Sequence, residues 1–417
     1  MQILVQKFGG TSVQSKQTRQ HVINQIENAL TKDYKLVVVV SALGRSPEPY
    51  ATDSLLDLVG YPEQAITDRE LDMLMACGEI ISSVVLSNEL KKKSINSVAL
   101  TGAQAGIQTN ADYNQAKIRE VNPTRIYSEL KRHDVVVVAG FQGKNSIGEL
   151  TTLGRGGSDT TAAALGAALN AERIEIFTDV NGIMTADPRV VKEARALDVV
   201  TYREICNLAY QGAKVIHPRA VEIAMHAKVP IRVRSTYENN GGTLVTTMPT
   251  KKAGVDVSDR LVTGIAHLAN VTQIKVQTKE IQAYRIQSDV FKAMADAGIS
   301  IDFINISPTG VVYTVPNVQA KKAISILESR DFKPKVTTNC AKVSVVGAGM
   351  TGVPGVASRI VQALTSEGVQ ILQSADSHTT IWVLISGEDL YQAVNALHDE
   401  FDLSNNSTVL HDFYIER

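Results

Sequence analysis

Short runs of β-branched residues alternate with helical patterns through the first 245 residues of the chain. The runs are LVVVV (36–40), DVVVVAG (134–140), IEIFTD (174–179) and VPIRVRS (229–235). Continuous Val and Ile without polar alternation are typical of parallel strands that are buried on both faces. Ahead of the first of these runs, Val22, Ile26 and Leu30 recur at the spacing of one helical face. The pattern predicts a doubly wound α/β domain with a mostly parallel sheet.

Beyond a polar stretch at 248–260, which we expect to be a linker, the chain repeats its pattern. TQIKV (272–276) and AKVSVV (341–346) each precede an amphipathic helix. Other landmarks recur 70 positions apart: Gly298 with Gly368, and the helical segment 320–327 with 390–397. The repeat favours two ferredoxin-like βαββαβ modules. Two unrelated small α+β folds are the alternative.

Composition excludes several classes of protein. A chain of 417 residues with 44% apolar residues, 20% charged residues and a net charge of −1 indicates two or three globular domains and no nucleic-acid partner. Cys77, Cys206 and Cys340 are scattered, which argues against a disulfide framework and a zinc site. We find neither a signal peptide nor a run of about 18 apolar residues. We therefore expect a cytoplasmic protein without membrane contact.

A glycine pair follows the first expected strand, in KFGGTS at 7–12. Thr11 or Ser12 stands where a helix N-cap is expected, so the segment is a strand-to-helix turn. Such turns bind ligands in open α/β sheets. The spacing is not that of a Walker A loop, and Lys7, Gly9 and Gly10 alone indicate only an anion-binding or a structural turn.

A second glycine-rich stretch, TTLGRGGSDTTAAALGAAL (151–169), precedes an alanine-rich helix. Residues suited to a tight turn and a helix cap are Gly154, Gly156, Gly157, Ser158, Asp159 and Thr160. Free amides at a helix start favour an anion, and Arg155 suits a carboxylate or phosphate. A capped helix without a ligand is the alternative. Two such turns in one domain favour a substrate with more than one anionic group.

Two further segments follow at the end of the α/β pattern. The loop TDVNGIMTADPR (178–189) follows a strand and carries Arg189, as loops that hold a nucleotide do. The segment YQGAKVIHPRA (210–220) adds Lys214 and His217, for which a structural role is as plausible as a functional one.

One acidic residue interrupts an apolar helical run, Glu79 within the segment 68–83. A carboxylate on a buried face is costly unless it has a partner. Either Glu79 pairs with a nearby arginine, or it receives an ammonium group from a ligand.

Read in order, the motifs resemble those of the aspartate kinases, in the amino-acid kinase superfamily. They are QKFGGTSV, SALG, CGE, TGAQAG, VAGFQG, TTLGRGGSDTTA, FTDVNG, TADPR, GAKVIHPRAVE and RVRSTY. The tail is similar to the paired ACT modules of the same enzymes, so the resemblance covers the whole chain. Kinases for acetylglutamate, glutamate or uridylate share the fold but lack this combination.

The resemblance implies a domain plan and a reaction. The plan is a catalytic domain at 1–245, a linker with the opening strand of the second ACT module at 246–268, a first module at 269–338 and a second at 339–417. The reaction transfers the γ-phosphoryl group of ATP, with Mg²⁺ on its phosphates, to the β-carboxylate of L-aspartate. It is the first step toward lysine, diaminopimelate, threonine and methionine. A homo-oligomer formed through the ACT modules is also implied.

The resemblance also implies site residues. The catalytic pair is Lys7 and Asp159. The expected aspartate-binding residues are Ser41, Thr52, Glu79, Arg155, Gly156, Gly157 and Ser158. The expected ATP-binding residues are Lys7, Phe8, Gly9, Gly10, Thr178, Asp179, Met184, Thr185, Asp187, Arg189, Lys214 and Val215. Protein ligands of the metal are not indicated.

An amino-acid effector is expected at the second ACT module. The first module lacks the Pro-Gly turn of many ligand-holding modules, whereas the second keeps it. The expected effector residues are Met350, Thr351, Gly352, Val353, Pro354, Gly355, Gln373, Ser374 and Asp376. Diaminopimelate, lysine and threonine are the candidate effectors, and the degenerate first module most resembles the diaminopimelate-sensitive type.

Two departures and two rival functions remain. Many relatives have tyrosine at the position of Met184, and the loop 44–54 is longer than in some, which weakens the assignment of Thr52. A kinase acting on glutamate is one rival. A sensor built on an inactive kinase fold is the other, but the presence of Lys7, Arg155 and Asp159 argues against it.

Overall fold

The computed structural model describes residues 1–213, 215–238, 241–247, 261–277, 283–350 and 352–405. The expected linker at 248–260 lies outside these residues. The chain divides into two compact units. None of the helices in the described ranges has the length and apolar character needed to cross a bilayer.

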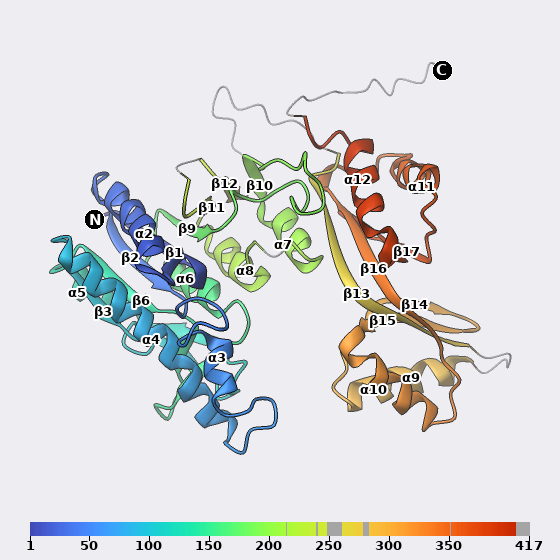
Figure 1. Cartoon of the computed structure of the whole chain (residues 1–417), viewed down its shortest axis with the longest axis horizontal. Helices are drawn as coiled ribbons and strands as arrows, with labels where there is room; N and C mark the ends of the chain where they lie inside the picture. The colour runs from blue at the N-terminus through green and yellow to red at the C-terminus, as the bar shows by residue number, and fades with distance from the viewer. Residues whose placement is uncertain (214, 239–240, 248–260, 278–282, 351, 406–417) are drawn as a thin grey trace. The chain divides into compact units, whose positions relative to one another are not determined.

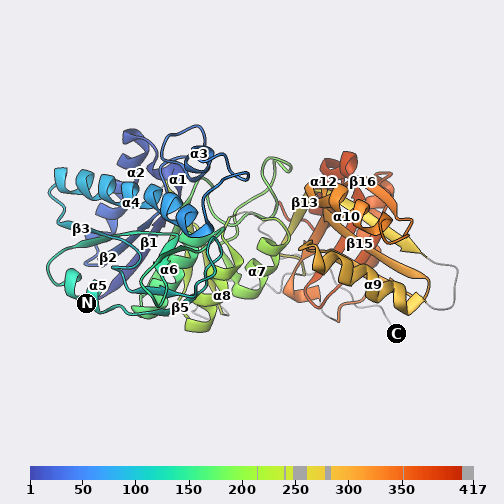
Figure 2. The ribbon, with the colours of Figure 1, turned by 90° about the horizontal axis from the view of Figure 1, so that it is seen from below.

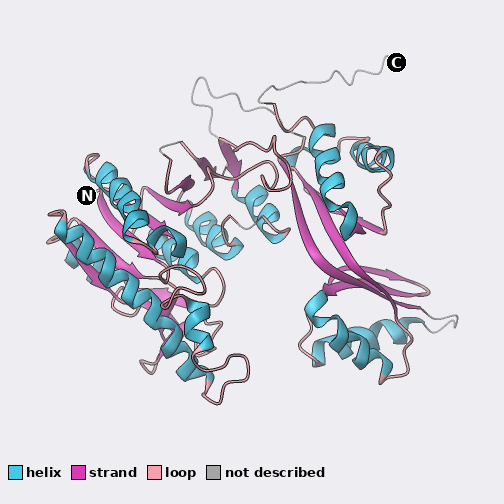
Figure 3. Cartoon of the chain, viewed as in Figure 1, coloured by secondary structure: helices cyan, strands magenta, loops and turns pink. Residues whose placement is uncertain are grey.

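The first unit is built on a sheet of eight strands among the described residues (Figure 3). In spatial order they are β10 (Val199–Thr201), β12 (Thr243–Thr246), β11 (Ile231–Ser235), β9 (Arg173–Thr178), β1 (Ile3–Phe8), β2 (Lys35–Val40), β6 (Val135–Ala139) and β3 (Ser97–Leu100). Every neighbouring pair is parallel except β11 with β12. The mostly parallel sheet predicted from the sequence is confirmed.

The valine runs lie at the centre of this sheet, side by side. In the register of β2 and β6, Val37 faces Val136 and Val39 faces Val138. All four side chains are fully buried, because helices cover both faces of the sheet. This explains why these strands lack the polar alternation of a half-exposed sheet.

The helices of the first unit divide between those two faces (Figure 2). They are α1 (Gly10–Val13), α2 (Lys16–Leu30), α3 (Thr52–Asp57), α4 (Asp68–Lys92), α5 (Thr124–Leu130), α6 (Gly157–Ala168), α7 (Tyr202–Tyr210) and α8 (Pro218–Ala227). Helices α2 and α4 share a core with Leu4 and Phe8. On the other face, α6 approaches β9 so closely that a Cβ on Gly166 would lie 2.5 Å from Ile174.

A small second sheet lies beside the main one. Its strands, in spatial order, are β5 (Ile118–Val121), β4 (Ile107–Thr109), β7 (Gln142–Lys144) and β8 (Leu150–Thr152). Helix α4 packs along β8. Because β8 ends two residues before Gly154, this sheet sets the starting point of the second glycine-rich turn.

The helix caps differ from those expected at both glycine-rich turns. The chain forms the short α1 immediately after Gly9, and α2 begins only after Ser15, whose side chain makes a capping box with Thr18. Neither Thr11 nor Ser12 is therefore the cap. At the second turn, Gly156 occupies the N-cap position of α6 in a left-handed conformation, ahead of the expected Ser158, Asp159 and Thr160.

The second unit is built on a six-stranded antiparallel sheet among the described residues (Figure 1). Its strands, in spatial order, are β14 (Asp302–Ser307), β15 (Gly310–Pro316), β13 (Gly264–Gln277), β16 (Lys335–Val346), β18 (Thr380–Ser386) and β17 (Gln373–Asp376). The long strands β13 and β16 run through the middle. The first half of β13 pairs with the last half of β16, since Gly264 faces Val346.

The two largest hydrophobic cores of the described second unit lie along these long strands. Around α9 (Ala283–Asp296) and α10 (Asn317–Glu328), the core includes Ile274 and Tyr313. Around α11 (Val356–Ser366) and α12 (Leu390–Glu400), it includes Val343 and Ile385. Short 3₁₀ turns at Ala348–Met350 and Gly387–Asp389 precede these last helices. The half around α9 and α10 has the βαββαβ order of a ferredoxin-like module. In the half around α11 and α12, the first part of β13 supplies a strand from earlier in the chain, so β13 and β16 serve both halves.

Two short segments from within the first 245 residues belong to the second unit. They are Thr185–Arg195 and Tyr210–Ala213. The backbone N–H of Ile265 donates to the carbonyl of Thr185 at 2.7 Å, and the side chain of Asn395 donates to the carbonyl of Val190 at 3.1 Å. Ala186 and Val191 are buried in the core around α12.

Candidate active site

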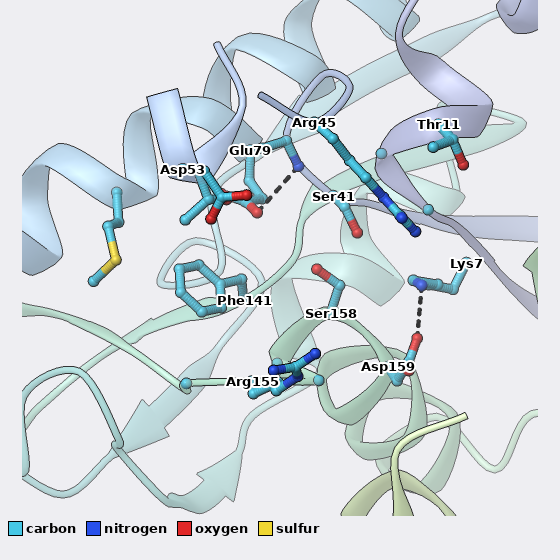
Figure 4. A pocket seen from close by; sticks show the side chains of 18 of the residues that line it. Lys7, Thr11, Ser41, Arg45, Asp53, Glu79, Phe141, Arg155, Ser158 and Asp159 are labelled. Carbon is cyan, nitrogen blue, oxygen red and sulfur yellow. Dashed lines mark hydrogen bonds and ion pairs between the residues drawn. The ribbon is translucent and has the colours of Figure 1, made fainter. Parts of the chain in front are cut away.

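A cavity of about 930 Å³ opens at the carboxyl ends of the central strands of the first unit (Figure 4). The ends of β1, β2 and β9 contribute Lys7, Ser41 and Thr178 to its lining, and Phe141 follows β6. Parallel α/β sheets bind their ligands at this edge. The fold thus brings both glycine-rich turns, which are far apart in the sequence, into one cavity.

An ion pair spans the two glycine-rich turns. The Nζ atom of Lys7 lies 2.7 Å from Oδ1 of Asp159, and each side chain retains 13% of its exposure. Lys7 stands near the end of β1, the strand between β2 and β9. Asp159 lies in the first turn of α6. The lysine is therefore held over the cavity while its ammonium group remains accessible to an anion.

The other oxygen of Asp159 is anchored by the start of α8. The backbone N–H of His217 donates to Oδ2 of Asp159 at 3.3 Å, and the ring of His217 accepts from the N–H of Arg219 as the helix cap. Burial lowers the pKa of His217, although Asp159 acts in the opposite direction. The histidine therefore connects α8 to the carboxylate of Asp159.

Gly156 is required by this packing. Its φ of 71° lies in the left-handed region, and a Cβ atom there would lie 2.2 Å from Cγ of His217. No side chain fits in that space. The glycine brings the turn against the histidine ring, with Arg155 on one side and Asp159 on the other.

Gly10 packs closely against the loop after β2. A Cβ atom on it would lie 2.7 Å from the carbonyl of Gly44 and 2.8 Å from that of Ala42. The carbonyl of Gly10 also accepts from the N–H of Gly44 at 3.0 Å. The second glycine of the pair thus packs the first turn against the loop after β2, and Gly9 lines the cavity beside it.

Glu79 is the deeply buried acid predicted on α4, with 3% of its surface exposed. Its Oε1 accepts from the N–H of Ala42 at 3.1 Å. Its Oε2 has no hydrogen-bond partner in the described part of the chain. Burial raises the pKa of Glu79 to about 8, and the Ala42 N–H opposes this rise. No arginine of the described ranges therefore pairs with Glu79, and its Oε2 remains without a partner at the cavity wall.

Arg155 lies across the cavity from Glu79, with Ser41 and Ser158 between them (Figure 4). The aspartate-binding residues expected from the sequence all line this cavity: Ser41, Thr52, Glu79, Arg155, Gly156, Gly157 and Ser158. A cation and a carboxyl group on opposite walls match the α-carboxylate and the α-ammonium group of an amino acid, respectively.

The residues expected at the nucleotide are divided by the fold. Lys7, Gly9, Gly10, Thr178, Asp179 and Val215 line the cavity. Thr178 donates its hydroxyl to Asp179 at 3.0 Å. Lys214 lies outside the described residues. Phe8 does not line the cavity, because it is fully buried and stacked on Phe177 with the ring centroids 4.6 Å apart.

The segment from Met184 to Arg189 does not line the cavity either. Met184 forms an isolated bridge with Ala196, and the chain then enters the second unit. Arg189 donates to both oxygens of Asp187, at 3.0 and 2.7 Å, and this bond lowers the pKa of the Asp187 carboxyl. The family resemblance had placed Met184, Thr185, Asp187 and Arg189 at ATP, but they lie away from this cavity.

Several lining residues were not predicted. They include Arg45, Asp53, Asn114, Gln115 and Phe141. Figure 4 shows the side chain of Arg45 pointing into the cavity toward Lys7. Phe141 follows a fully buried strand within VAGFQG, and its φ is 68°. An aromatic residue directly after a buried strand was the one feature of the sequence that could have indicated a cavity residue at this position. Nothing in the sequence around Asn114 indicates that it lines the cavity.

The described residues contain no group of three or more metal-binding side chains. Among the cavity acids, Asp159 is paired with Lys7 and Glu79 is buried, whereas Asp53 and Asp179 have side chains at the lining. This donor set is what a Mg²⁺ ion held mainly by phosphate oxygens and water requires.

The expected effector residues are spread over the second unit. Gly352 and Gly355 have left-handed φ values, and Gly355 is the N-cap of α11. Met350 is buried in the core, and Val353 is exposed. Thr351 lies outside the described residues. On β17, Gln373 accepts from Gln273 at 2.9 Å and donates to the carbonyl of Phe303 at 2.5 Å, and Ser374 and Asp376 follow it.

Family comparisons agree with this two-part plan. Residues 2–235 match the amino acid kinase family, and residues 335–399 match the ACT domain. Aspartokinase 1 of Bacillus subtilis (strain 168) is 60% identical over 404 residues, which are 97% of this chain and 100% of that protein.

Solved structures of aspartokinases also match this chain over nearly its whole length. E. coli aspartokinase III in complex with aspartate and ADP (R-state) has a TM-score of 0.76 and 26% identity, and the match covers 96% of this chain and 99% of that one. The same enzyme in complex with lysine and aspartate (T-state) has a TM-score of 0.75 and 25% identity, with 96% and 99% covered.

Proposed function

This chain belongs to the aspartokinases, ATP-dependent enzymes of the amino acid kinase family with ACT domains, and we propose how its residues perform the reaction. The reaction is transfer of the γ-phosphoryl group of ATP to the β-carboxylate of L-aspartate, giving 4-phospho-L-aspartate and ADP. The observation that carries the assignment of roles is the Lys7–Asp159 pair in the same cavity as Arg155 and Glu79.

Aspartate is oriented by its two α-substituents. The guanidinium of Arg155 binds the α-carboxylate, for which its planar set of donors is suited. Glu79 receives the α-ammonium on its unpaired Oε2. With both ends fixed on opposite walls, the β-carboxylate projects toward Lys7, with Ser41, Thr52 and Ser158 around the acceptor.

The β-carboxylate is already ionised at neutral pH, so the reaction needs no strong general base. The difficulty is the approach of two anions. Lys7 supplies positive charge to the transferred phosphoryl group, and Asp159 keeps its Nζ in place. Such catalysis consists of positioning and of electrostatic stabilisation.

The nucleotide occupies the part of the cavity near the end of β9. Thr178, Asp179 and Val215 line it there, and Gly9 and Gly10 present the turn to the phosphates. Mg²⁺ accompanies ATP and offsets phosphate charge when bound. Asp179, which follows β9, is the cavity carboxylate that would hold the ion or its water.

The ACT region regulates the enzyme by binding an amino-acid end product. A lysine complex is known for the related E. coli enzyme, which makes lysine the first candidate here, before threonine and diaminopimelate. The N-terminus of α11 after Gly355 and the edge strand β17 are the proposed effector contacts. Free amides at a helix start suit an effector carboxylate.

A homo-oligomer is formed through the second unit. Both outer strands of its sheet, β14 and β17, are edges in the described chain, and Ile304 and Ile306 on β14 are exposed by 47% and 55%. Exposed apolar edge strands favour pairing with another chain. Light scattering after size exclusion, with and without lysine, tests this proposal. A monomer under both conditions contradicts it.

A coupled assay of ADP release tests the activity and the acceptor. ADP should appear with aspartate and remain near background with glutamate, because the longer side chain moves the acceptor carboxylate away from Lys7. Lysine, threonine and diaminopimelate are then added singly at a fixed aspartate concentration. Equal rates with glutamate contradict the proposed acceptor, and no response to any of the three contradicts the proposed regulation.

A further inference from the structure

Helix α4 carries a second buried acid, Asp72, two turns before Glu79, and its side chain is fully buried. Its Oδ1 accepts from the N–H of Asn114 at 3.0 Å and from the hydroxyl of Thr152 at 2.5 Å. Its Oδ2 accepts from the N–H of Thr152 at 2.8 Å. One carboxylate thus ties α4 to two segments that lie 42 and 80 residues away along the chain.

This arrangement is costly unless the hydrogen bonds offset it. A buried carboxylate loses its hydration, and burial raises the pKa of Asp72, while the bonds from Thr152 and Asn114 lower it. Its hydrogen bonds in the described chain come from two backbone N–H groups and one hydroxyl. Bonds to a charged acceptor are shorter and stronger than neutral ones, so Asp72 fixes the positions of these donors.

The first segment that Asp72 holds is part of the cavity wall. Asn114 lines the cavity, and its φ is 65°, in the left-handed region. Its side-chain Oδ1 is buried without a hydrogen-bond partner in the described ranges. The bond from its N–H to Asp72 therefore stabilises a strained residue that presents a polar atom near the cavity.

The second segment leads directly to the arginine of the site. Thr152 ends β8, and Gly154 and Arg155 follow. A Cβ atom on Gly154 would lie 2.9 Å from the carbonyl of Asn114. The two segments held by Asp72 thus pack against each other one residue before Arg155. A shift of either segment moves the guanidinium.

We propose that Asp72 is a positioning residue for the acceptor amino acid: through Asn114 and Thr152 it fixes the wall of the cavity that carries Arg155. Asp72 lines no part of the cavity itself, so it acts through its two partners. The inference rests on the proposed function, in which Arg155 binds the acceptor. The bonds of Asp72 reach the acceptor wall, whereas the nucleotide end of the cavity is formed by the residues after β9.

The test compares substitutions on adjacent residues of β8. Thr152→Val removes the hydroxyl bond to Asp72 at nearly constant volume, and Thr152→Ser keeps it. Thr151 provides the matched control, because its hydroxyl is also buried and lies 2.6 Å from that of Thr109. Thr151→Val therefore removes one buried hydrogen bond from the same strand without affecting Asp72.

We expect Thr152→Val to raise KM for aspartate about tenfold while KM for ATP stays within about twofold, because small displacements of an orienting group cost this much or more. Thr152→Ser should restore the wild-type KM for aspartate. Asp72→Asn should have the larger effect, since an amide NH₂ would face the N–H of Thr152. Thr151→Val should lower the melting temperature and leave both KM values unchanged.

Two outcomes overturn the proposal. One is a wild-type KM for aspartate in Thr152→Val. The other is an equal rise of both KM values in Thr152→Val and Thr151→Val, which would indicate a general loss of structure. Both outcomes require a wild-type enzyme that turns over aspartate. A wild type that releases no ADP with aspartate instead contradicts the proposed function, so the two failures are distinguishable.

Discussion

The Nζ atom of Lys7 lies 2.7 Å from Oδ1 of Asp159, which joins the end of the central strand β1 to the first turn of α6. The lysine is therefore oriented before any substrate enters. A flexible lysine would lose rotamer freedom on binding its phosphate, and this structure has already restricted it. Preorganisation of this kind benefits the transition state more than the substrate.

Replacement of Lys7 by alanine should lower kcat about 100-fold or more, because one preorganised positive contact to the reacting group is lost. The KM values for aspartate and ATP should change much less. Initial rates of ADP release over a grid of both substrates measure the three parameters. Lys35→Ala is the matched control, since Lys35 makes an ion pair of the same 2.7 Å length with Asp134 at the start of β2.

Near-native turnover in the Lys7→Ala variant would remove this residue from the chemistry. An equal loss of turnover in the Lys35→Ala variant would show that ion pairs on these strands act through stability alone.

Affinity for aspartate should increase with pH. Burial raises the pKa of Glu79 to about 8, so the free enzyme holds this carboxyl mostly protonated at pH 7. The substrate ammonium requires the carboxylate form. The ionised fraction rises about tenfold from pH 6 to 7 and about fivefold from pH 7 to 8, and KM for aspartate should fall with it. Steady-state kinetics at half-unit steps measure the slope.

Glu79→Gln provides the comparison for this profile. A neutral amide of the same shape should give a high KM for aspartate that does not vary over this pH range. KM for ATP should be little affected in both forms. A flat profile in the wild type would show that Glu79 does not exchange its proton for the substrate ammonium.

Gly156→Ala should damage both stability and substrate binding. The residue has a φ of 71°, and the added Cβ would lie 2.2 Å from the ring of His217. The strain and the clash together are worth several kcal/mol unless the turn moves, and a moved turn displaces Arg155 and Asp159. Thermal melting and KM for aspartate are the measurements. Gly241→Ala, with open space around it, should behave as the wild type.

The second unit should lose stability below neutral pH through His398. Its ring is fully buried, Nε2 lies 2.9 Å from the hydroxyl of Thr185, and burial lowers its pKa. The folded chain therefore resists a proton that the unfolded chain accepts near pH 6.5. Stability from this group is complete above about pH 6.5 and falls as the pH drops below that value.

Melting temperatures at pH 7.5 and 5.5 test this sign. The decrease should be smaller in His398→Gln than in the wild type, although His398→Gln starts from a lower value. His226→Gln is the control, because His226 is exposed at the end of α8. An equal decrease in all three proteins would exclude His398 as the source.

The sequence predicts the architecture well where the polarity of a segment allows only one kind of environment. The valine runs of β2 and β6 have no polar face, and only a sheet that is covered on both sides can accept them. Glu79 was identifiable because it breaks the pattern around it: it is a charged residue in a helical run that is otherwise apolar. Its Oε2, buried without a hydrogen-bond partner in the described chain, is the atom that we propose receives the substrate ammonium.

Long-range partners are what local patterns could not reveal. Asp72 lies in the same helical run as Glu79, but its role depends on Asn114 and Thr152, which no periodicity connects to it. The cap of α6 was misplaced because Gly156 adopts a conformation set by the ring of His217. Phe8, next to Lys7, is directed into the core by the alternation of β1.

The segment Thr185–Arg195 has a practical consequence for engineering. Its backbone is hydrogen-bonded to Ile265 and Asn395, and Arg195 donates to the carbonyl of Leu403. A chimera made at a single junction near residue 260 would join a foreign regulatory tail to a chain that still carries its own segment Thr185–Arg195. The buried groups of that segment would then face side chains of another protein. When regulatory tails are exchanged between relatives, the segment equivalent to Thr185–Arg195 should therefore be exchanged together with the tail.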